Sequence, residues 1–144
     1  MSVVGTGTQP PQANHALLHR FLGIGLVVTA AALGVTRYLT TGLTPDPYTL
    51  LTYLLAGVSA AMAGAALMFL KGQVPERRAG QMSAQYWADP KVAGPAMLFW
   101  FILEGAGVVA SVAYFLEGSP SSAVLALVVI VAFWMNGPRA FDKE

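Results

Sequence analysis

Four stretches of the chain are almost entirely apolar, and polar or Gly/Pro-containing segments separate them. They cover residues 17–40, 47–71, 93–117 and 120–137. An α-helix rises about 1.5 Å per residue, so about 20 residues cross a hydrocarbon core of roughly 30 Å. The pattern therefore predicts an all-α chain, an integral membrane four-helix bundle that forms a single membrane domain over residues 1–144.

Short connections join the first predicted helix to the second and the third to the fourth. The segments Thr41–Asp46 and Gly118–Ser119 are brief enough to force each pair of helices to be antiparallel neighbours. The bundle is therefore expected to consist of two antiparallel transmembrane hairpins. The one substantial loop, residues 72–92, lies between them and is expected on the cytoplasmic side.

Helix-terminal residues flank the predicted helices. Asp46-Pro47 and Ser119-Pro120 each place a capping oxygen before a proline at the first helical position. Four glycines follow the predicted ends and are expected to act as left-handed caps: Gly42, Gly72, Gly118 and Gly137. Starts and ends therefore agree on where the helices lie.

The start of the third helix has two solutions. Asp89-Pro90 is a further cap signal, but Pro95 would then lie inside the helix and remove a backbone hydrogen bond. The helix is expected either to begin near Gly94 or to be kinked there.

Composition agrees with a bilayer environment and excludes several classes of function. The chain is 56% hydrophobic and 10% charged, against about 25% charged in soluble domains. A soluble bundle would need a polar outer face, yet Val124–Met135 carries no polar side chain except the indole of Trp134. The net charge of +1 provides no basic field for nucleic acid. The absence of cysteine removes disulfides and thiolate metal sites.

The basic residues gather at one end of the predicted bundle. Of the eight Lys and Arg residues, only Arg37 lies near the other end. The positive-inside rule then places both termini in the cytoplasm and predicts a multi-pass protein of a bacterial inner (cytoplasmic) membrane. The polar N-terminal segment 1–14 lacks the basic residues of a secretory signal, so the first helix is expected to be retained as a signal anchor.

Aromatic residues near the helix ends are expected to form interfacial belts. The outer belt would contain Tyr38, Tyr48, Tyr114 and Phe115. The inner belt would contain Tyr86, Trp87, Trp134 and Phe141.

Glu104 lies near the centre of the third apolar stretch, about 14 Å along the helix from Pro95. An ionised carboxylate near the bilayer midplane is costly, so this one should face the bundle or an oligomer contact and be protonated or hydrogen-bonded. Trp100, Gly107 and Ser111 share its helical stripe and are expected to form a supporting shell. Glu104 then either fixes packing as a neutral hydrogen-bond donor or handles a proton or ion.

The second apolar stretch is rich in small residues, which let another helix backbone approach closely. Two small-xxx-small pairs overlap there: Gly57 with Ala61, and Ala60 with Gly64. The second helix is therefore predicted to be a contact helix, with either its own chain or a partner subunit as the neighbour.

The segment 53–116 contains, in order, a Gly/Ala-rich helix, a polar loop with Pro-Glu-Arg-Arg at 75–78 and a helix with a central Glu104. In this arrangement it resembles the proteolipid or c subunit of rotary ATPases, over less than half of the chain. The resemblance implies that Glu104 would bind a translocated proton or cation. The whole chain also resembles small, uncharacterised four-helix bacterial membrane proteins with an acid-bearing third helix and a short basic C-terminal end, here residues 136–142.

Two histidines and an arginine lie at the inner end of the first helix. His15 and His19 are four residues apart and share a helical face, next to Arg20. Such a pair can hold a metal, and one imidazole can ligate a haem or a chlorophyll. His and Arg at an interface also suit lipid headgroups. No metal site is assigned, and haem or chlorophyll is kept as a candidate cofactor.

No catalytic motif occurs in the sequence, so an enzyme with a soluble small-molecule substrate is not expected. The loop Lys71–Lys91 is amphipathic and suits either the membrane surface or a partner subunit. The leading hypothesis is an accessory, non-catalytic transmembrane subunit of a larger energy-converting complex, either of respiratory electron transport or of photosynthesis. Its small-residue helix and terminal segments would contact membrane lipids and other transmembrane subunits.

Two alternatives belong to other classes of protein. One is a proteolipid-like protein that translocates protons or ions through Glu104. The other is a pigment- or haem-carrying subunit that uses His15 or His19.

Overall fold

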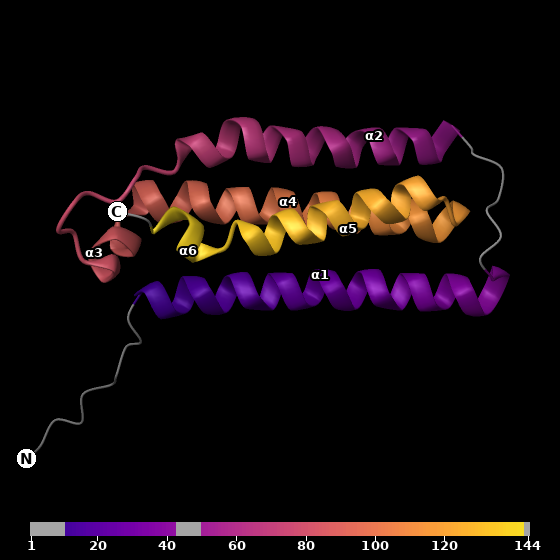
Figure 1. Cartoon of the computed structure of the whole chain (residues 1–144), viewed down its shortest axis with the longest axis horizontal. Coiled ribbons are helices and arrows are strands. Elements are labelled where there is room, and N and C mark those ends of the chain that lie inside the picture. The colour runs from indigo at the N-terminus through magenta and orange to yellow at the C-terminus, as the bar shows by residue number, and fades with distance from the viewer. Residues whose placement is uncertain (1–10, 43–49, 143–144) are drawn as a thin grey trace, which may run out of the picture.

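The chain is all-helical in a computed structural model (Figure 1). The structure describes residues 11–42 and 50–142. The helices are α1 (Pro11–Thr41), α2 (Leu50–Ala65), α3 (Ser83–Ala88), α4 (Pro90–Glu117), α5 (Pro120–Met135) and α6 (Pro138–Phe141). No strand occurs within the two described segments, which confirms the predicted all-α class.

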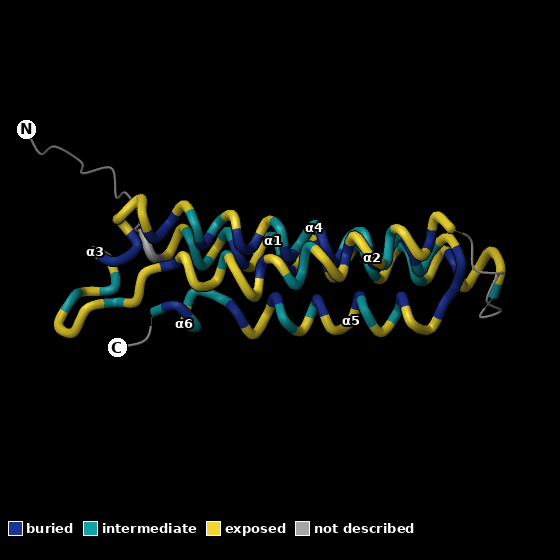
Figure 2. The backbone as a smooth tube through the Cα atoms, turned by 90° about the horizontal axis from the view of Figure 1, so that it is seen from above, coloured by how far each residue is buried: buried dark blue, intermediate teal, exposed yellow. Residues whose placement is uncertain are grey.

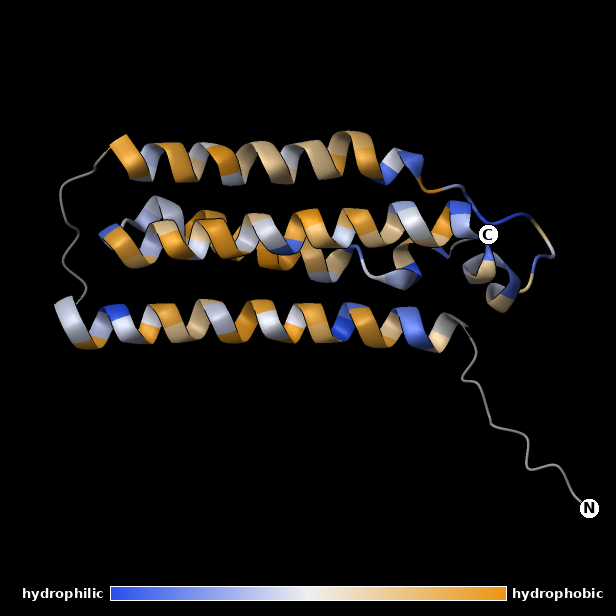
Figure 3. Cartoon of the chain, turned by 180° about the vertical axis from the view of Figure 1, so that it is seen from behind, coloured by the Kyte–Doolittle hydropathy of each residue, from blue (hydrophilic) through white to orange (hydrophobic). Residues whose placement is uncertain are grey.

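Three helices are long and apolar enough to cross a membrane, which indicates a membrane protein. They are α1, α4 and α2, the last continued by a π-helical turn (Ala66–Leu70) and a 3-10 turn (Lys71–Gln73). The fourth apolar stretch forms α5, whose 16 residues rise about 24 Å, less than a hydrocarbon core of roughly 30 Å. Figure 3 shows apolar residues along the long helices and polar ones gathered at the end that carries α3.

The helix α4 is the centre of the arrangement and packs against α1, α2 and α5. In Figure 1 it lies with α5 between α1 and α2. The turned view in Figure 2 shows α5 to one side, with its buried positions toward the other helices and its exposed positions outward. Only two residues, Gly118 and Ser119, separate α4 from α5.

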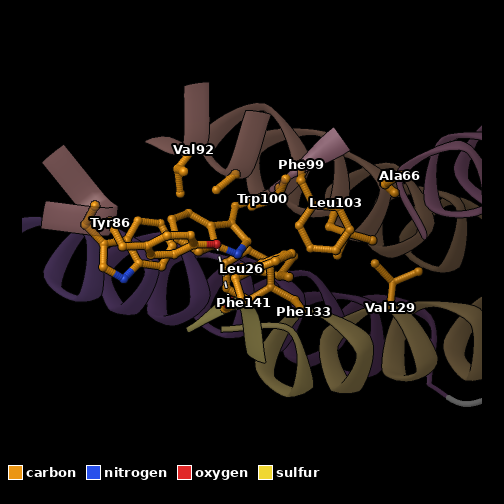
Figure 4. Close-up of a cluster of buried hydrophobic side chains, with 14 residues drawn as sticks. Leu26, Ala66, Tyr86, Val92, Phe99, Trp100, Leu103, Val129, Phe133 and Phe141 are labelled. Carbon is orange, nitrogen blue, oxygen red and sulfur yellow. Dashed lines mark hydrogen bonds between the residues drawn. The ribbon is translucent and has the colours of Figure 1, made fainter. Parts of the chain in front are cut away.

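The core lies on α4 and on the side chains that cover it (Figure 4). Trp100 and Leu103 of α4 and Phe133 of α5 are fully buried. Large apolar side chains nevertheless remain on the outside, since Phe21 is 67% exposed and Leu50 is 76% exposed. Such a surface is unfavourable in water, whereas lipid chains solvate it.

Two of the four predicted glycine caps are confirmed and two are wrong. Gly42 and Gly118 have φ of 70° and 67°, in the left-handed region. Gly72 lies inside the 3-10 turn that follows α2, and Gly137 is extended with φ −69°. Asn136 closes α5 in place of Gly137, because its Nδ2 donates to a carbonyl of the last turn at 2.8 Å.

The start of α4 is set by Asp89. Its carboxylate Oδ1 accepts a hydrogen bond from the backbone N–H of Lys91 at 2.9 Å, and Pro90 occupies the first helical position. The helix then continues through Pro95, so it does not begin near Gly94. Pro95 lies close enough to the start that it deprives only the first turn of a backbone hydrogen bond.

At α5, Ser119 occupies the predicted cap position and Pro120 the first helical one, but the serine does not cap with its side chain. Its hydroxyl lies 2.6 Å from the hydroxyl of Ser121. Several predictions fall outside the described residues, namely those on Asp46, Pro47, Tyr48 and the terminal segments 1–10 and 143–144.

The predicted inner aromatic belt is wrong for three of its four members. Tyr86 and Trp87 are each 1% exposed and Phe141 is 8% exposed, whereas Trp134 is 43% exposed. The helix α3 folds back against α1 and α4 and takes the first two residues into the core. The short helices α3 and α6 therefore close the core, and of these four aromatic side chains only Trp134 remains at the surface.

Candidate functional site

Glu104 lies in the middle of α4 and faces α1. A Cβ atom added to Gly25 would lie 3.9 Å from Glu104 Oε1, so the carboxylate rests against the part of α1 that has no side chain. Glu104 is half-buried. No described residue forms a hydrogen bond or an ion pair with it. The carboxylate faces α1, in agreement with the expectation that it faces the bundle or an oligomer contact. It does not form the hydrogen bond that was expected of it in the ionised form.

The predicted supporting shell does not form around Glu104. Trp100 Nε1 donates to the carbonyl of Asn136 at 2.8 Å, and Ser111 Oγ donates to the carbonyl of Gly107 at 2.8 Å. Gly107 accommodates Leu26, since an added Cβ would lie 2.7 Å from a methyl carbon of that side chain. The three shell residues are buried on α4. The side-chain donors of Trp100 and Ser111, however, bond to backbone carbonyls and not to the carboxylate of Glu104.

The face of α2 that contacts the rest of the chain is formed by residues other than the small-residue pairs. Thr52, Ser59 and Ala66 are buried at intervals of seven residues, and Ser59 Oγ donates to the carbonyl of Ala106 at 2.8 Å. Gly105 of α4 completes the contact, because an added Cβ would lie 3.1 Å from Met62 Cε.

The predicted packing residues lie on another side of α2. At about 100° per residue, Gly57 is displaced by about 140° from Thr52 around the helix. Gly57, Ala60 and Ala61 are exposed and Gly64 is half-buried. A Cβ added to either glycine would meet nothing within 4 Å. Of the two neighbours left open for these residues, the described part of the chain provides none, and their face, which we call the outer face of α2, is open.

His19 is enclosed by aromatic side chains in the N-terminal part of α1. Its ring stacks on Phe133 at a centroid distance of 4.4 Å and meets the edges of Trp100 and Trp134 at 5.1 and 5.7 Å. Its Nε2 lies 3.1 Å from the carbonyl oxygen of Phe133, which can only accept, so Nε2 donates this hydrogen bond. A metal ligated through Nε2 would break that bond, and the geometry thus favours a packing role.

His15 packs separately against Trp87, with ring centroids 5.2 Å apart. Within residues 11–42 and 50–142, no group of three or more His, Cys, Asp or Glu side chains converges on a metal-sized site. The assignment of haem or chlorophyll to His15 or His19 stays a prediction.

A buried arginine at the opposite end was not singled out by sequence reasoning as part of a site. Arg37 is 3% exposed, and its Nη1 donates to the carbonyls of Phe115 and Leu116 at 3.3 and 3.0 Å. Glu117, which the sequence analysis also did not single out, is 2% exposed at the C-terminal end of α4. A cation at the last carbonyls of a helix is favoured by its dipole. The signal was available, because two successive antiparallel hairpins make α1 and α4 parallel to each other and bring residues 37 and 117, near their C-terminal ends, to the same level.

The end of the bundle that carries α3 is closed by polar contacts between the loop and the C-terminal segment. Asp142 forms an ion pair with Arg77 at 2.9 Å and accepts a hydrogen bond from Ser83 Oγ. The Tyr86 hydroxyl lies 2.7 Å from the carbonyl of Pro75 and 3.2 Å from that of Phe141. Burial, and secondarily the charge of Asp142, raise the pKa of Tyr86. These contacts fasten the chain end and contain no nucleophile–base pair.

Comparison of the chain with known protein families, with curated proteins and with solved structures finds no match.

Proposed function

We propose that the chain is a non-catalytic transmembrane subunit that packs against another membrane subunit through the outer face of α2. One observation carries this proposal: α2 uses Thr52, Ser59 and Ala66 inside the chain and leaves a second set of small residues uncovered. The partner would be an apolar helix whose backbone can approach Gly57 and Gly64.

The physical argument rests on how helices associate in lipid. Lipid tails are as apolar as leucine, so burial of apolar area does not drive association, and close backbone packing contributes instead. Against lipid a glycine gains nothing from its lack of a side chain. Against a helix it permits the short interhelical distance that brings many atoms into contact. The outer face of α2 therefore suits a protein neighbour better than lipid.

The proposed topology has four membrane crossings and both chain ends at the basic, cytoplasmic side of an inner membrane. Its support is the packing of α5 along α4, together with the gathering of basic residues at one end, where Arg20 and Arg139 line one cavity and Lys71 lines another with Ala140. A host complex of respiration or photosynthesis stays a prediction from the sequence. Visible absorbance of the co-purified assembly tests it.

The experiment replaces a residue of the outer face by leucine in the full-length chain. Gly57→Leu and Ala60→Leu place a bulky side chain where the isolated chain has open space, so they should leave its fold intact. Purification in mild detergent from the native membrane, followed by native gel and mass spectrometry, should show loss of the partner subunit. Ala31→Leu is the matched control, because Ala31 is an exposed alanine of α1.

Two results would contradict the proposal. One is an unmodified chain that purifies alone or only as a homo-oligomer. The other is a partner subunit that stays bound in both α2 variants.

A second candidate function is ion or proton handling by Glu104. The observation in its favour is that the half-buried carboxylate beside Gly25 has no hydrogen-bond partner among the described residues, which leaves its oxygens available for a proton or a cation. An ionisable side chain within an apolar helix is by default a candidate for ion or proton transfer. Glu104→Gln should abolish proton or cation flux in liposomes and leave assembly unchanged, while Glu76→Gln in the exposed loop should preserve flux. Absence of flux from the unmodified protein would rule this function out.

A further inference from the structure

A cavity of about 220 Å³ lies at the inner end of the molecule, between α1 and the corner where α5 turns into α6. Its wall includes Arg20 of α1, Trp134 and Met135 of α5, and Arg139 of α6. The cavity therefore brings together two arginines that are 119 positions apart in the sequence (139 − 20).

The corner that shapes this cavity is held rigidly. The indole of Trp100 donates to the carbonyl of Asn136 at 2.8 Å, and the amide of Asn136 donates to the carbonyl of Ala132 at 2.8 Å. Gly137 lets the ring of His19 approach closely, since an added Cβ would lie 3.1 Å from His19 Cε1. These contacts fix the direction in which the chain leaves α5 and thereby place Arg139 beside α1.

Among the residues that the structure describes, the wall of this cavity is positively charged without a compensating acid. Arg20 and Arg139 are exposed, neither forms an ion pair with a described residue, and no carboxylate of residues 11–42 and 50–142 lines the cavity. Two other cavities at this end include Glu76 in their walls. Asp142, close to Arg139 in sequence, is occupied by Arg77 and Ser83. An anion would therefore be attracted to this cavity more strongly than to its neighbours.

The surroundings of the two arginines are apolar. Phe21 follows Arg20 and is 67% exposed, and Met135 is 74% exposed at the end of α5. Both belong to helices whose outer surfaces suit lipid chains. A ligand that satisfies the whole site therefore has an anionic head and a long apolar tail.

We propose that this cavity binds the phosphate headgroup of an anionic phospholipid through Arg20 and Arg139, with an acyl chain along Phe21 and Met135. The planar guanidinium group pairs two N–H donors with two phosphate oxygens, which a carbon-rich cavity wall makes stronger than in water. Basic pockets between helices on the cytoplasmic side are suited to such headgroups. The inference does not depend on a partner for the outer face of α2.

The test uses the full-length chain in nanodiscs of phosphatidylcholine mixed with phosphatidylglycerol, two lipids of similar tails and different headgroup charge. Native mass spectrometry after mild detergent release measures which lipid stays bound. The unmodified chain should retain phosphatidylglycerol in preference to phosphatidylcholine. Arg20→Gln and Arg139→Gln should each reduce this preference about fivefold, and the double variant more strongly.

Arg78→Gln is the matched control, because Arg78 is an exposed arginine at the same end and lies outside this cavity. It should preserve the preference, and an equal loss would show that general surface charge attracts the lipid. Arg20→Lys and Arg139→Lys keep the charge and remove the paired donors, so they should lose less than the glutamine variants. They also keep the test decisive if a glutamine variant fails to fold.

The remaining outcomes overturn the proposal. Retention of phosphatidylglycerol by the folded double variant at the unmodified level, or unchanged retention in both lysine and glutamine variants, would exclude the two arginines. Displacement of the bound lipid by millimolar inorganic phosphate as efficiently as by added phosphatidylglycerol would identify a free-anion site instead of a lipid site.

Discussion

The helices α2 and α4 have the same mean hydropathy in their most apolar stretches, but the fold uses them differently. In these stretches 50% of the residues are buried in α4 and 11% in α2. The helix α4 is covered on several sides by α1, α2 and α5, whereas α2 touches mainly α4. Apolarity brings a helix into the bilayer, and the fit of small and hydroxyl-bearing residues decides which side is covered by protein.

The strongest test of this difference removes a leucine from each helix. Leu103→Ala in α4 should lower the free energy of unfolding by ~2–3 kcal/mol, because the fully buried side chain leaves a cavity. The expected loss lies in the lower part of the range for buried leucines, because lipid also solvates the leucine side chain in the unfolded state. Leu54→Ala in α2, where the side chain is 57% exposed, should change stability little. Denaturant titration in mixed micelles measures both, and equal losses would contradict the comparison.

A second test adds volume at a glycine of each helix. Gly107→Val should destabilise the fold by ~1–3 kcal/mol, because the new side chain would collide with Leu26 on α1. Gly57→Val meets open space and should be neutral within about 0.5 kcal/mol. Thermal unfolding of the two purified variants in one detergent compares them directly. A neutral Gly107→Val would mean that α1 and α4 are not in close contact.

A smaller effect is expected at the hydrogen bond from Ser59 of α2 to the backbone of α4. Ser59→Ala removes the donor to the carbonyl of Ala106 and should cost about 0.6 kcal/mol, the mean for interhelical hydrogen bonds in membrane proteins. Thr40→Ala is the control, because its hydroxyl bonds only within α1. Mixed-micelle unfolding should show a loss for Ser59→Ala that exceeds that of the control.

The last prediction concerns alkaline pH and the region where α3 covers the start of α4. The raised pKa of Tyr86 means that the folded chain holds the phenol proton to higher pH than the unfolded chain. This stabilisation is complete below the ordinary tyrosine pKa of about 10 and is lost as the pH rises through the folded-state value. As the pH is raised past about 10, Tyr86→Phe should lose less unfolding free energy than the unmodified chain does. Tyr38→Phe, at an exposed position, should lose as much as the unmodified chain, and denaturant titration at each pH measures both.

The candidate site shows where prediction from the sequence succeeded and where it did not. The position of Glu104 in the middle of an apolar helix followed from local spacing, and the cost of a charge in lipid predicted that it faces the bundle or an oligomer contact. The structure turns it toward Gly25 of α1. The shell of Trp100 and Ser111 did not form around Glu104. Residues on one stripe of a helix point in a similar direction, but each side chain bonds to the acceptor that lies nearest to it. The nearest acceptors are backbone carbonyls of Asn136 and Gly107.

The sequence by itself determined the helices, since apolar length, proline at the first turn and the Asp89 cap act within a few residues. Only the tertiary structure decided which side of α2 packs. A helix in lipid is apolar on every side, so it has no amphipathic pattern that would indicate the packed side. The tertiary structure likewise decided that His19 donates to the carbonyl of Phe133 and that Arg37 donates to the end of α4. Such contacts depend on how whole helices are placed against each other, which local spacing does not encode.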